Sequence, residues 1–246
     1  MHDSDDDRKR ALREEVWQAL RDAGVARFPG TRGRIPNFTG AESAAERLRG
    51  LDLWTTATTV KSNPDSPQWP VRQRALEDGM TVFIAVPRLR EERPFLRLDP
   101  ERLDVRPRAA SSIKGSAEHG VPVGVDELEP VDLVVVGCVA VDRSGARLGK
   151  GGGFADLEFA LASAARLIGP QTTVVTTVHP LQMVADGRIP MTGHDVPLDV
   201  IVTPDEVITC ASGRERPAGI LWDHLPPDKV DEIPLLRRLA AARRVG

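Results

Sequence analysis

The chain has 246 residues, of which 41% are hydrophobic and 28% charged, values typical of a globular protein with one large domain or two small ones. A formal net charge of −3 and a pI near 6.0 argue against nucleic acid or an anionic membrane surface as partner. Two cysteines cannot form a disulfide framework or a four-cysteine zinc site, and no apolar stretch approaches a signal segment or a membrane helix, so we expect a cytoplasmic protein.

Predicted helices and strands alternate along the chain. Helical spacing of apolar residues first appears at residues 9–23, and a Gly- and Pro-rich loop follows at 28–38. The predicted helices are 9–23, 41–48, 70–77, 113–120, 156–167 and 233–244, and the predicted strands are 55–60, 82–86, 133–141, 172–178 and 200–202. Because strands alternate with helices, we predict an α/β fold with a mostly parallel sheet flanked by helices. We expect a single domain over residues 1–210 and, over 211–246, a Pro-rich tail whose helix packs back on it.

The most informative segment, residues 145–156, reads G-A-R-L-G-K-G-G-G-F-A-D between a buried strand and a helix. Gly149, Gly151, Gly152 and Gly153 can bring backbone N–H groups close to an anion, and Lys150 adds a positive charge. The spacing is neither a Walker A motif nor a dinucleotide fingerprint. It predicts an anion-binding loop, with a flexible connection as the alternative.

Asp156 follows this loop and has two interpretations of equal weight. Aspartate is a favoured helix N-cap, and a carboxylate beside a phosphate loop is also a common Mg²⁺ ligand.

The five lysines fall into two groups. Lys9, Lys61 and Lys150 lie in segments with other functional signs, whereas Lys114 and Lys229 fit solvated faces. An ammonium group acts as a point charge toward phosphate, which makes the first group candidates for an anion site.

The glycine segment resembles the R-L-G-x-G-x-G-Y-Y-D signature of 5-formyltetrahydrofolate cyclo-ligases. Other segments agree with this family in chain order. They are the K-R-x-L-R helix at Lys9–Arg13, the E-P turn at Glu129–Pro130, and the ending at His194–Asp195, Asp199 and Thr203–Pro204. The sequence is more similar to a divergent synthetase domain-containing branch, whose motifs correspond to Ile35–Phe38, Asn63–Arg72, Pro87–Arg90 and Gly149–Glu158.

The resemblance implies a three-layer fold of the NagB/RpiA/CoA-transferase type and an ATP- and Mg²⁺-dependent ligase. Such a ligase phosphorylates the formyl oxygen of 5-formyltetrahydrofolate, N10 attacks the activated carbon, and 5,10-methenyltetrahydrofolate, ADP and phosphate are released. It further implies site roles. ATP would be bound by Lys9, Arg13, Gly149, Lys150, Gly151, Gly152, Gly153 and Phe154, Mg²⁺ by Asp156, and folate by Lys61, Asp65, Trp69 and Glu129, with Trp54, Trp69 or Phe154 as a stacking face. Alanine at Lys150 or Asp156 is expected to abolish turnover and leave the fold intact.

Departures from the signature affect the folate half of the site. The paired aromatic residues of the family are Phe154–Ala155 here, and the acidic folate turn is residues 61–65, where Asp65 alone offers a carboxylate. Two alternatives therefore stay open: a non-catalytic folate- or nucleotide-binding regulator, and an ATP-dependent ligase acting on another small metabolite. A monomer and a homodimer are both compatible with the sequence.

A few other residues have both a functional and a structural interpretation. His194 is a candidate for lining the site, and His179 is a weaker one. Cys138, in the middle of a predicted strand, is expected to be an inert core residue. Arg88 and Arg90 follow a strand and are either folate-tail ligands or part of a solvated loop.

Overall fold

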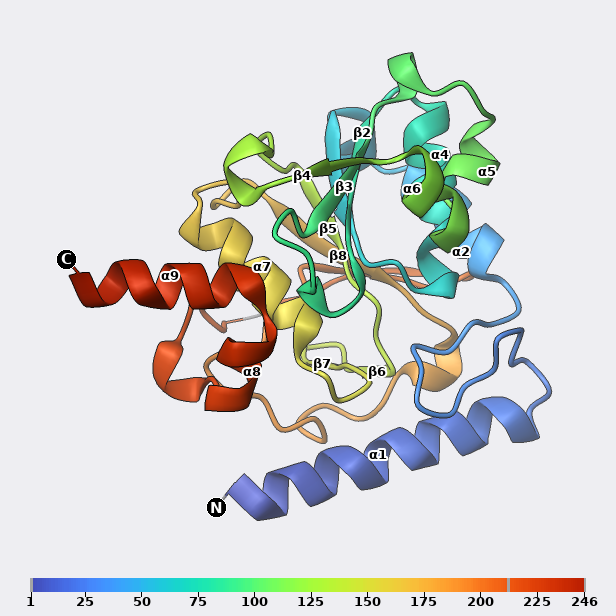
Figure 1. The fold of residues 1–246 in the computed structure, drawn as a ribbon. Helices are drawn as coiled ribbons and strands as arrows, with labels where there is room; N and C mark the ends of the chain where they lie inside the picture. The colour runs from blue at the N-terminus through green and yellow to red at the C-terminus, as the bar shows by residue number, and fades with distance from the viewer. Residues whose placement is uncertain (1, 212, 246) are drawn as a thin grey trace.

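The computed structural model describes residues 2–211 and 213–245, with side chains described for 5–211 and 213–243. An eight-stranded sheet of order β10-β9-β8-β5-β1-β2-β3-β4 forms its centre (Figure 1). The strands are β1 (Thr59–Ser62), β2 (Thr81–Ala85), β3 (Phe95–Leu98), β4 (Val121–Val123), β5 (Leu133–Val135), β8 (Thr173–Thr177), β9 (Val200–Val202) and β10 (Val207–Thr209), with a separate hairpin of β6 (Ala140–Val141) and β7 (Arg147–Leu148). The helices are α1 (His2–Asp22), α2 (Ala41–Arg49), α3 (Asp52–Thr55), α4 (Trp69–Glu77), α5 (Pro107–Ala110), α6 (Ile113–His119), α7 (Phe154–Ala164), α8 (Pro227–Glu232) and α9 (Pro234–Val245).

The sheet is mostly parallel, as predicted. Strands β9, β8, β5, β1 and β2 run in the same direction, whereas β10, β3 and β4 add antiparallel pairs at the two edges. Buried aliphatic runs such as 133–135 fit this interior position, because helices cover both faces of a parallel sheet. The carboxyl ends of the parallel strands therefore share one edge.

Helices cover both faces of the sheet and give three layers (Figure 1). On one face, α2 and α4 pack on Val60, Ile84 and Val135. On the other face, α7 packs on Val134 and Val174, and the start of α9 packs beside Phe83 and Phe95. The predicted three-layer α/β architecture is confirmed.

The long N-terminal helix lies outside these layers. Helix α1 packs on the β6–β7 hairpin through an apolar cluster that includes Val16, Leu20, Ala140 and Leu148. It begins at His2, earlier than the predicted start at residue 9. Figure 1 shows it running along one end of the molecule.

Two predicted strands differ from the structure. The apolar run 133–141 is divided into β5 and β6, which belong to different sheets, because Gly137 and its neighbours leave the central sheet at a strand end. The predicted strand 55–60 lies later, at Thr59–Ser62, after the short helix α3. Lys61 is consequently a strand residue, and the prediction that it belongs to a polar turn is wrong.

The C-terminal segment returns to the body of the protein. Ile233, Leu235 and Leu236 are buried with Phe83 of β2 and Phe95 of β3. The division of the chain at residue 210 stays a prediction.

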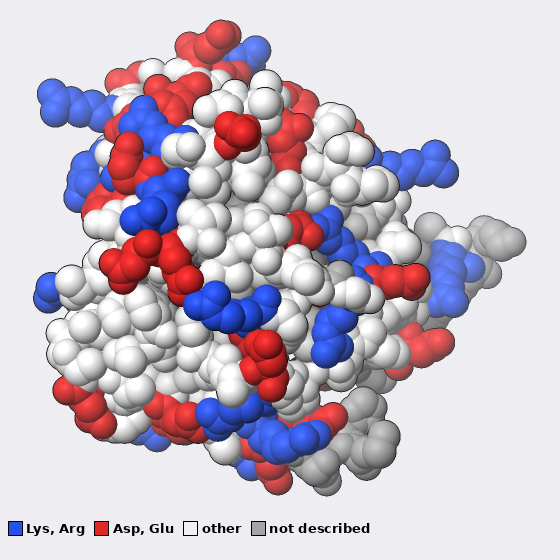
Figure 2. Space-filling view, turned by 180° about the vertical axis from the view of Figure 1, so that it is seen from behind, with Lys and Arg blue, Asp and Glu red and all other residues white. Residues whose placement is uncertain are grey.

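The distribution of charged side chains on the surface agrees with the nearly equal numbers of basic and acidic residues in the sequence. On the face opposite to that seen in Figure 1, lysines and arginines are interspersed with acidic residues, without a broad area of one charge sign (Figure 2). Within residues 2–211 and 213–245, no helix combines the length and apolarity needed to span a bilayer.

Candidate functional site

The candidate site is a cleft of about 510 Å³ at the carboxyl edge of the parallel strands. Its walls come from Asn63–Ser66 after β1, Val86–Arg88 after β2, Gly137 after β5, and Gly149–Asp156 ahead of and within α7, apart from Gly151. In open α/β sheets, ligands bind at this edge, because the loops that follow the strands face a common crevice. The topology therefore brings the glycine segment and the Asp65 turn into one cavity.

The glycine loop, residues 149–153, needs glycine at two positions. Gly151 and Gly153 have φ values of 109° and 65°, which other residues rarely adopt. Gly153 is the N-cap of α7, so the helix begins at Phe154 and the prediction of Asp156 as N-cap is wrong. The loop follows the β6–β7 hairpin, and so does not follow a parallel strand directly as expected.

Basic residues predicted to bind phosphate surround this loop. Arg13 Nε donates a hydrogen bond to the Gly149 carbonyl at 2.7 Å. Lys150 Nζ lies 2.8 Å from Asp65 Oδ1, and the contact joins the glycine loop to the turn after β1. Burial of Arg13 lowers the pKa of its guanidinium despite the nearby Asp6 and Asp195.

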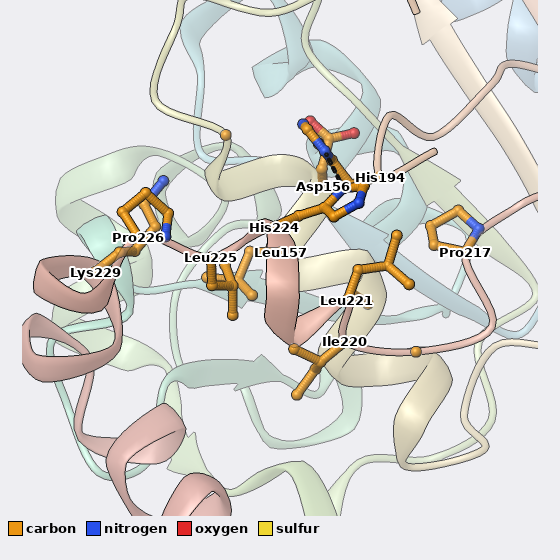
Figure 3. A pocket seen from close by; sticks show the side chains of 13 residues that line it. Asp156, Leu157, His194, Pro217, Ile220, Leu221, His224, Leu225, Pro226 and Lys229 are labelled. Atoms are coloured by element: carbon orange, nitrogen blue, oxygen red, sulfur yellow. Dashed lines mark hydrogen bonds between the residues drawn. The ribbon is translucent and has the colours of Figure 1, made fainter. Parts of the chain in front are cut away.

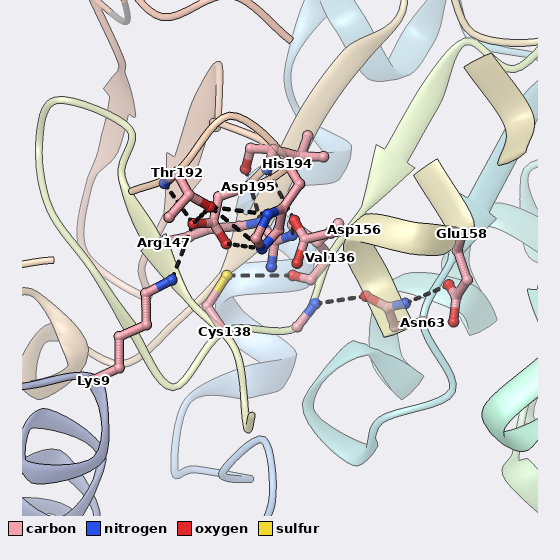
Figure 4. Close-up of polar contacts among 12 residues, drawn as sticks. Lys9, Asn63, Val136, Cys138, Arg147, Asp156, Glu158, Thr192, His194 and Asp195 are labelled. Atoms are coloured by element: carbon pink, nitrogen blue, oxygen red, sulfur yellow. Dashed lines mark hydrogen bonds and ion pairs between the residues drawn. The ribbon is translucent and has the colours of Figure 1, made fainter. Parts of the chain in front are cut away.

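Lys9 approaches the site through Asp195. Its Nζ lies 3.0 Å from Asp195 Oδ2, which also accepts hydrogen bonds from the backbone and hydroxyl of Thr192 (Figure 4). Burial opposes ionisation of Asp195, but the bonds from Thr192 and the charge of Lys9 outweigh it and lower the pKa of the carboxyl. Lys9 is thus held in an ion pair with Asp195, and neither residue belongs to the lining of the cleft.

Asp156 lines the cleft and forms an ion pair with Arg147, whose side chain is 2% exposed. Its Oδ1 also accepts the backbone N–H of Val196 at 2.9 Å. Removing this carboxylate would leave a guanidinium group buried without its counter-ion. In contrast to the expectation from the sequence, we therefore predict that alanine at Asp156 destabilises the fold, and the Mg²⁺ role of Asp156 likewise stays a prediction.

Lys61 lies beneath the cleft rather than at its surface. In register with Phe83 and Val134, it points toward α7 and forms a buried ion pair with Glu158. Glu158 Oε2 also accepts from Asn63 Nδ2 at 2.8 Å, and Asn63 Oδ1 accepts from the Gly137 N–H at 3.0 Å (Figure 4). Burial raises the pKa of Glu158, although Lys61 opposes the shift.

The sequence did not single out Asn63 and Glu158 as site residues. Both line the cleft, where the amide of Asn63 links the carboxylate to the chain after β5. Asn63 lies in the turn that follows the predicted strand 55–60, a position that could have marked it. Glu158 gave no such signal, because its partner Lys61 lies 97 residues earlier in the chain.

The tryptophans and Glu129 lie away from the cleft lining. Trp54 is buried and donates to Asp78, and Trp69 Nε1 donates to the Arg108 carbonyl at 3.1 Å. Glu129 lies 2.7 Å from Arg97 and precedes β5, at the amino end of that strand. These placements do not support the predicted substrate contacts of Trp54, Trp69 and Glu129.

Three other predicted residues have distinct surroundings. Phe154 and Arg88 line the cleft, and Arg88 has a φ of 59°, an unusual conformation for a non-glycine residue. Arg90 lies 3.1 Å from Glu232 of α8, within a surface ion pair. His194 lies next to Asp195 and contacts His224, whereas His179 packs edge-on against Phe38.

Cys138 is expected to resist thiol reagents in the folded protein. Burial raises the pKa of its thiol, and that of half-buried Cys210, to about 11 in each case, so very little reactive thiolate exists at neutral pH. We expect both thiols of the native protein to react slowly with a colorimetric disulfide reagent at pH 7.5. In the denatured protein, both thiols should react rapidly. Rapid reaction of a thiol in the native state would contradict this assignment.

Comparisons with known proteins give the family of the chain. Residues 5–204 match the model of the 5-formyltetrahydrofolate cyclo-ligase family. The methenyltetrahydrofolate synthase domain-containing protein of Mus musculus is 40% identical over 235 residues, covering 94% of this chain and 63% of the relative. Its Homo sapiens counterpart is 37% identical over 237 residues, covering 95% and 61%. The chain thus spans about three fifths of the length of these relatives.

A plant enzyme and a solved structure extend the comparison. The mitochondrial 5-formyltetrahydrofolate cyclo-ligase of Arabidopsis thaliana is 38% identical over 82 residues, or 32% of this chain and 30% of the enzyme. The solution structure of 5,10-methenyltetrahydrofolate synthetase from Aquifex aeolicus has a TM-score of 0.54 at 20% identity, covering 88% of this chain and 99% of that protein, and so shares the fold. With most of its length matched by the family model, the chain belongs to the 5-formyltetrahydrofolate cyclo-ligase family.

Proposed function

We propose that this chain converts 5-formyltetrahydrofolate to 5,10-methenyltetrahydrofolate with ATP and Mg²⁺, releasing ADP and phosphate. One observation carries the proposal: in a member of this family, the glycine loop and the Asp65 turn form two walls of the same cleft, and they meet at the 2.8 Å contact of Lys150 with Asp65. Phosphoryl transfer requires mainly positioning and charge neutralisation, and a cleft with an anion loop on one wall suits both requirements.

Residues of this chain would bind the two substrates and orient them in the cleft. Lys9, Arg13 and Lys150 would hold the nucleotide phosphates, with residues 149–153 supplying backbone N–H groups and Phe154 an apolar face. Support comes from Arg13, which donates to the Gly149 carbonyl, and from Phe154, which lines the cleft. Asp65 would contact the folate across the cleft.

The residues present fit a magnesium ion that is completed by phosphate oxygens. Among residues 5–211 and 213–243, no three His, Cys, Asp or Glu side chains gather into a closed metal site. Mg²⁺ is usually bound through one or two carboxylates and the substrate phosphates, and Asp65 and Asp156 both line the cleft. Bound there, the ion would neutralise charge on the phosphate oxygens, with Asp156 as its protein ligand.

Lys150→Ala is expected to lower kcat/KM by at least about 100-fold, because it removes a positive charge beside the transferring phosphate. The side chain is 45% exposed, so the fold should be preserved. The measurement is the near-ultraviolet absorbance of the methenyl product after mixing protein, 5-formyltetrahydrofolate and MgATP. Lys114→Ala, at a lysine with an 86% exposed side chain on α6, is the matched control. Equal rates for the two variants would remove Lys150 from the site.

A non-catalytic folate- or nucleotide-binding regulator is the second candidate, favoured by Ala155 in place of an aromatic residue and by the altered turn before Asp65. A tight complex with 5-formyltetrahydrofolate without ATP hydrolysis would support it. If the protein binds ATP but does not bind 5-formyltetrahydrofolate, the result would instead support a ligase for another small metabolite. A cytoplasmic location and a monomeric or homodimeric state stay predictions.

A further inference from the structure

The C-terminal segment places a lysine against the glycine loop. Lys229, on α8, donates a hydrogen bond to the Gly152 carbonyl at 2.6 Å, and its Nζ lies 4.8 Å from the centre of the Phe154 ring. A Cβ placed at Gly153 would lie 3.3 Å from the same Nζ. The prediction that Lys229 sits on a solvated face is therefore wrong.

The segment reaches the loop by crossing the start of α7. Figure 3 shows the small pocket formed there, which is lined by Lys229, Pro226 and Leu225 of the tail and by Leu157 of α7, next to Leu225. The pocket has a volume of about 90 Å³ and is mostly apolar. Lys229 is thus held at the rim of an apolar contact, with its ammonium directed at the loop.

Lys229 differs from the other lysines in its electrostatic partners. Lys9, Lys61, Lys114 and Lys150 each have a carboxylate oxygen within 4 Å, in Asp195, Glu158, Glu118 and Asp65 respectively. Over the described part of the chain, no carboxylate forms an ion pair with Lys229. Lys229 is nonetheless half-buried, whereas Lys114 is largely exposed.

A half-buried cation without an ion-pair partner is unfavourable unless an anion joins it. Burial lowers the pKa of Lys229 despite the more distant charges of Asp228, Glu232 and Asp156. The carbonyl of Gly152 satisfies one of the three donors of the ammonium and supplies no formal charge. The surroundings of Lys229 therefore fit a polyanion bound at the glycine loop.

Three basic groups from separate parts of the chain meet at this loop. Arg13 comes from α1, Lys150 from the loop itself and Lys229 from α8, and a Cβ at Gly151 would lie 3.5 Å from Arg13 Cζ. We propose that Lys229 is a phosphate-contacting residue, which the C-terminal segment adds to the nucleotide site. The inference rests on the proposed function, and it goes beyond the match to the family model, which ends at residue 204.

In this arrangement the ammonium keeps its bond to Gly152 and donates a second one to a phosphate oxygen. The face of Phe154 holds the group in place through a cation–π contact, so little ordering is needed when nucleotide binds. Since α8 continues into the helix that packs on the sheet, nucleotide contact through Lys229 would also fix the tail over the loop.

The test is ATP binding measured by calorimetry on the full chain without folate. Lys229→Met should lower the affinity for ATP and for inorganic tripolyphosphate at least about tenfold, because a charge-assisted hydrogen bond to phosphate is lost. The same variant should leave the affinity for adenosine unchanged. Lys114→Met, the matched control, should bind like wild type, and Lys229→Arg should retain part of the affinity. Equal ATP affinity for Lys229→Met and wild type would overturn the inference.

A second measurement requires no substitution. In the wild-type protein, tripolyphosphate should slow acylation of Lys229 by an amine reagent severalfold and leave Lys114 unaffected, as mapped on peptides. Unchanged labelling of Lys229 while tripolyphosphate is bound would contradict the contact. Failure of the wild type to bind either ATP or tripolyphosphate would overturn the nucleotide site itself, and so the proposed function together with this inference.

Discussion

Replacing Lys61 with methionine is expected to lower the free energy of unfolding by about 3–5 kcal/mol, because the change leaves the Glu158 carboxylate buried without its counter-ion. The side chains of Lys61 and Glu158 are 1% and 6% exposed, so water cannot take over the role of the ammonium. Asn63 would remain as the one side-chain donor that the described structure gives to this carboxylate. Urea denaturation at pH 8 measures the loss.

The pH dependence and a double variant test the cause of this loss. Burial raises the pKa of Glu158, and without Lys61 the smaller effect of Lys150 is the remaining charge that opposes the shift. A raised pKa in the folded state means that stability falls as pH rises through that value, so Lys61→Met should be less destabilised at pH 5 than at pH 8. Lys61→Met/Glu158→Leu should recover much of the stability. A single variant as stable as wild type at both pH values would contradict the buried pair.

Much of the fold could be predicted because its signals are local. Buried β-branched runs such as 200–202 and helix patterns such as 41–48 lie within a few residues of where the structure has the corresponding elements. The run 133–141 was misleading, because a strand and the hairpin that follows it are equally apolar when both are buried. Periodicity does not reveal the point at which a chain leaves one sheet for another.

The candidate site could be predicted in part, for a related reason. The glycine loop is a contiguous signature, and the structure places it in the same cleft as Asp65. The neighbours of Trp69 and Glu129 depend on where distant segments fold, and sequence spacing does not determine them. Lys229 is the opposite case, because we expected it on a solvated face and it contacts Gly152. The two residues are 77 positions apart, so sequence spacing does not reveal this contact either.

Asp156 has two roles that one substitution cannot separate. Asp156→Ala should destabilise the protein by about 3–5 kcal/mol, because the Arg147 guanidinium, whose side chain is 2% exposed, would lose its counter-ion. Loss of turnover in that variant would therefore be ambiguous between a missing Mg²⁺ ligand and a disturbed cleft. Thermal denaturation without ligands measures the structural part.

Asp156→Asn distinguishes the two roles. The amide oxygen can still accept the Val196 N–H and face Arg147, so the destabilisation should be smaller than for alanine. It lacks the charge that Mg²⁺ requires, and kcat/KM should fall by at least about 100-fold. If the Asp156→Asn variant is folded and needs far more Mg²⁺ than the wild type to reach its half-maximal rate, Asp156 is identified as the metal ligand. Retained activity at the wild-type Mg²⁺ requirement would leave Asp156 with only its structural pairing to Arg147.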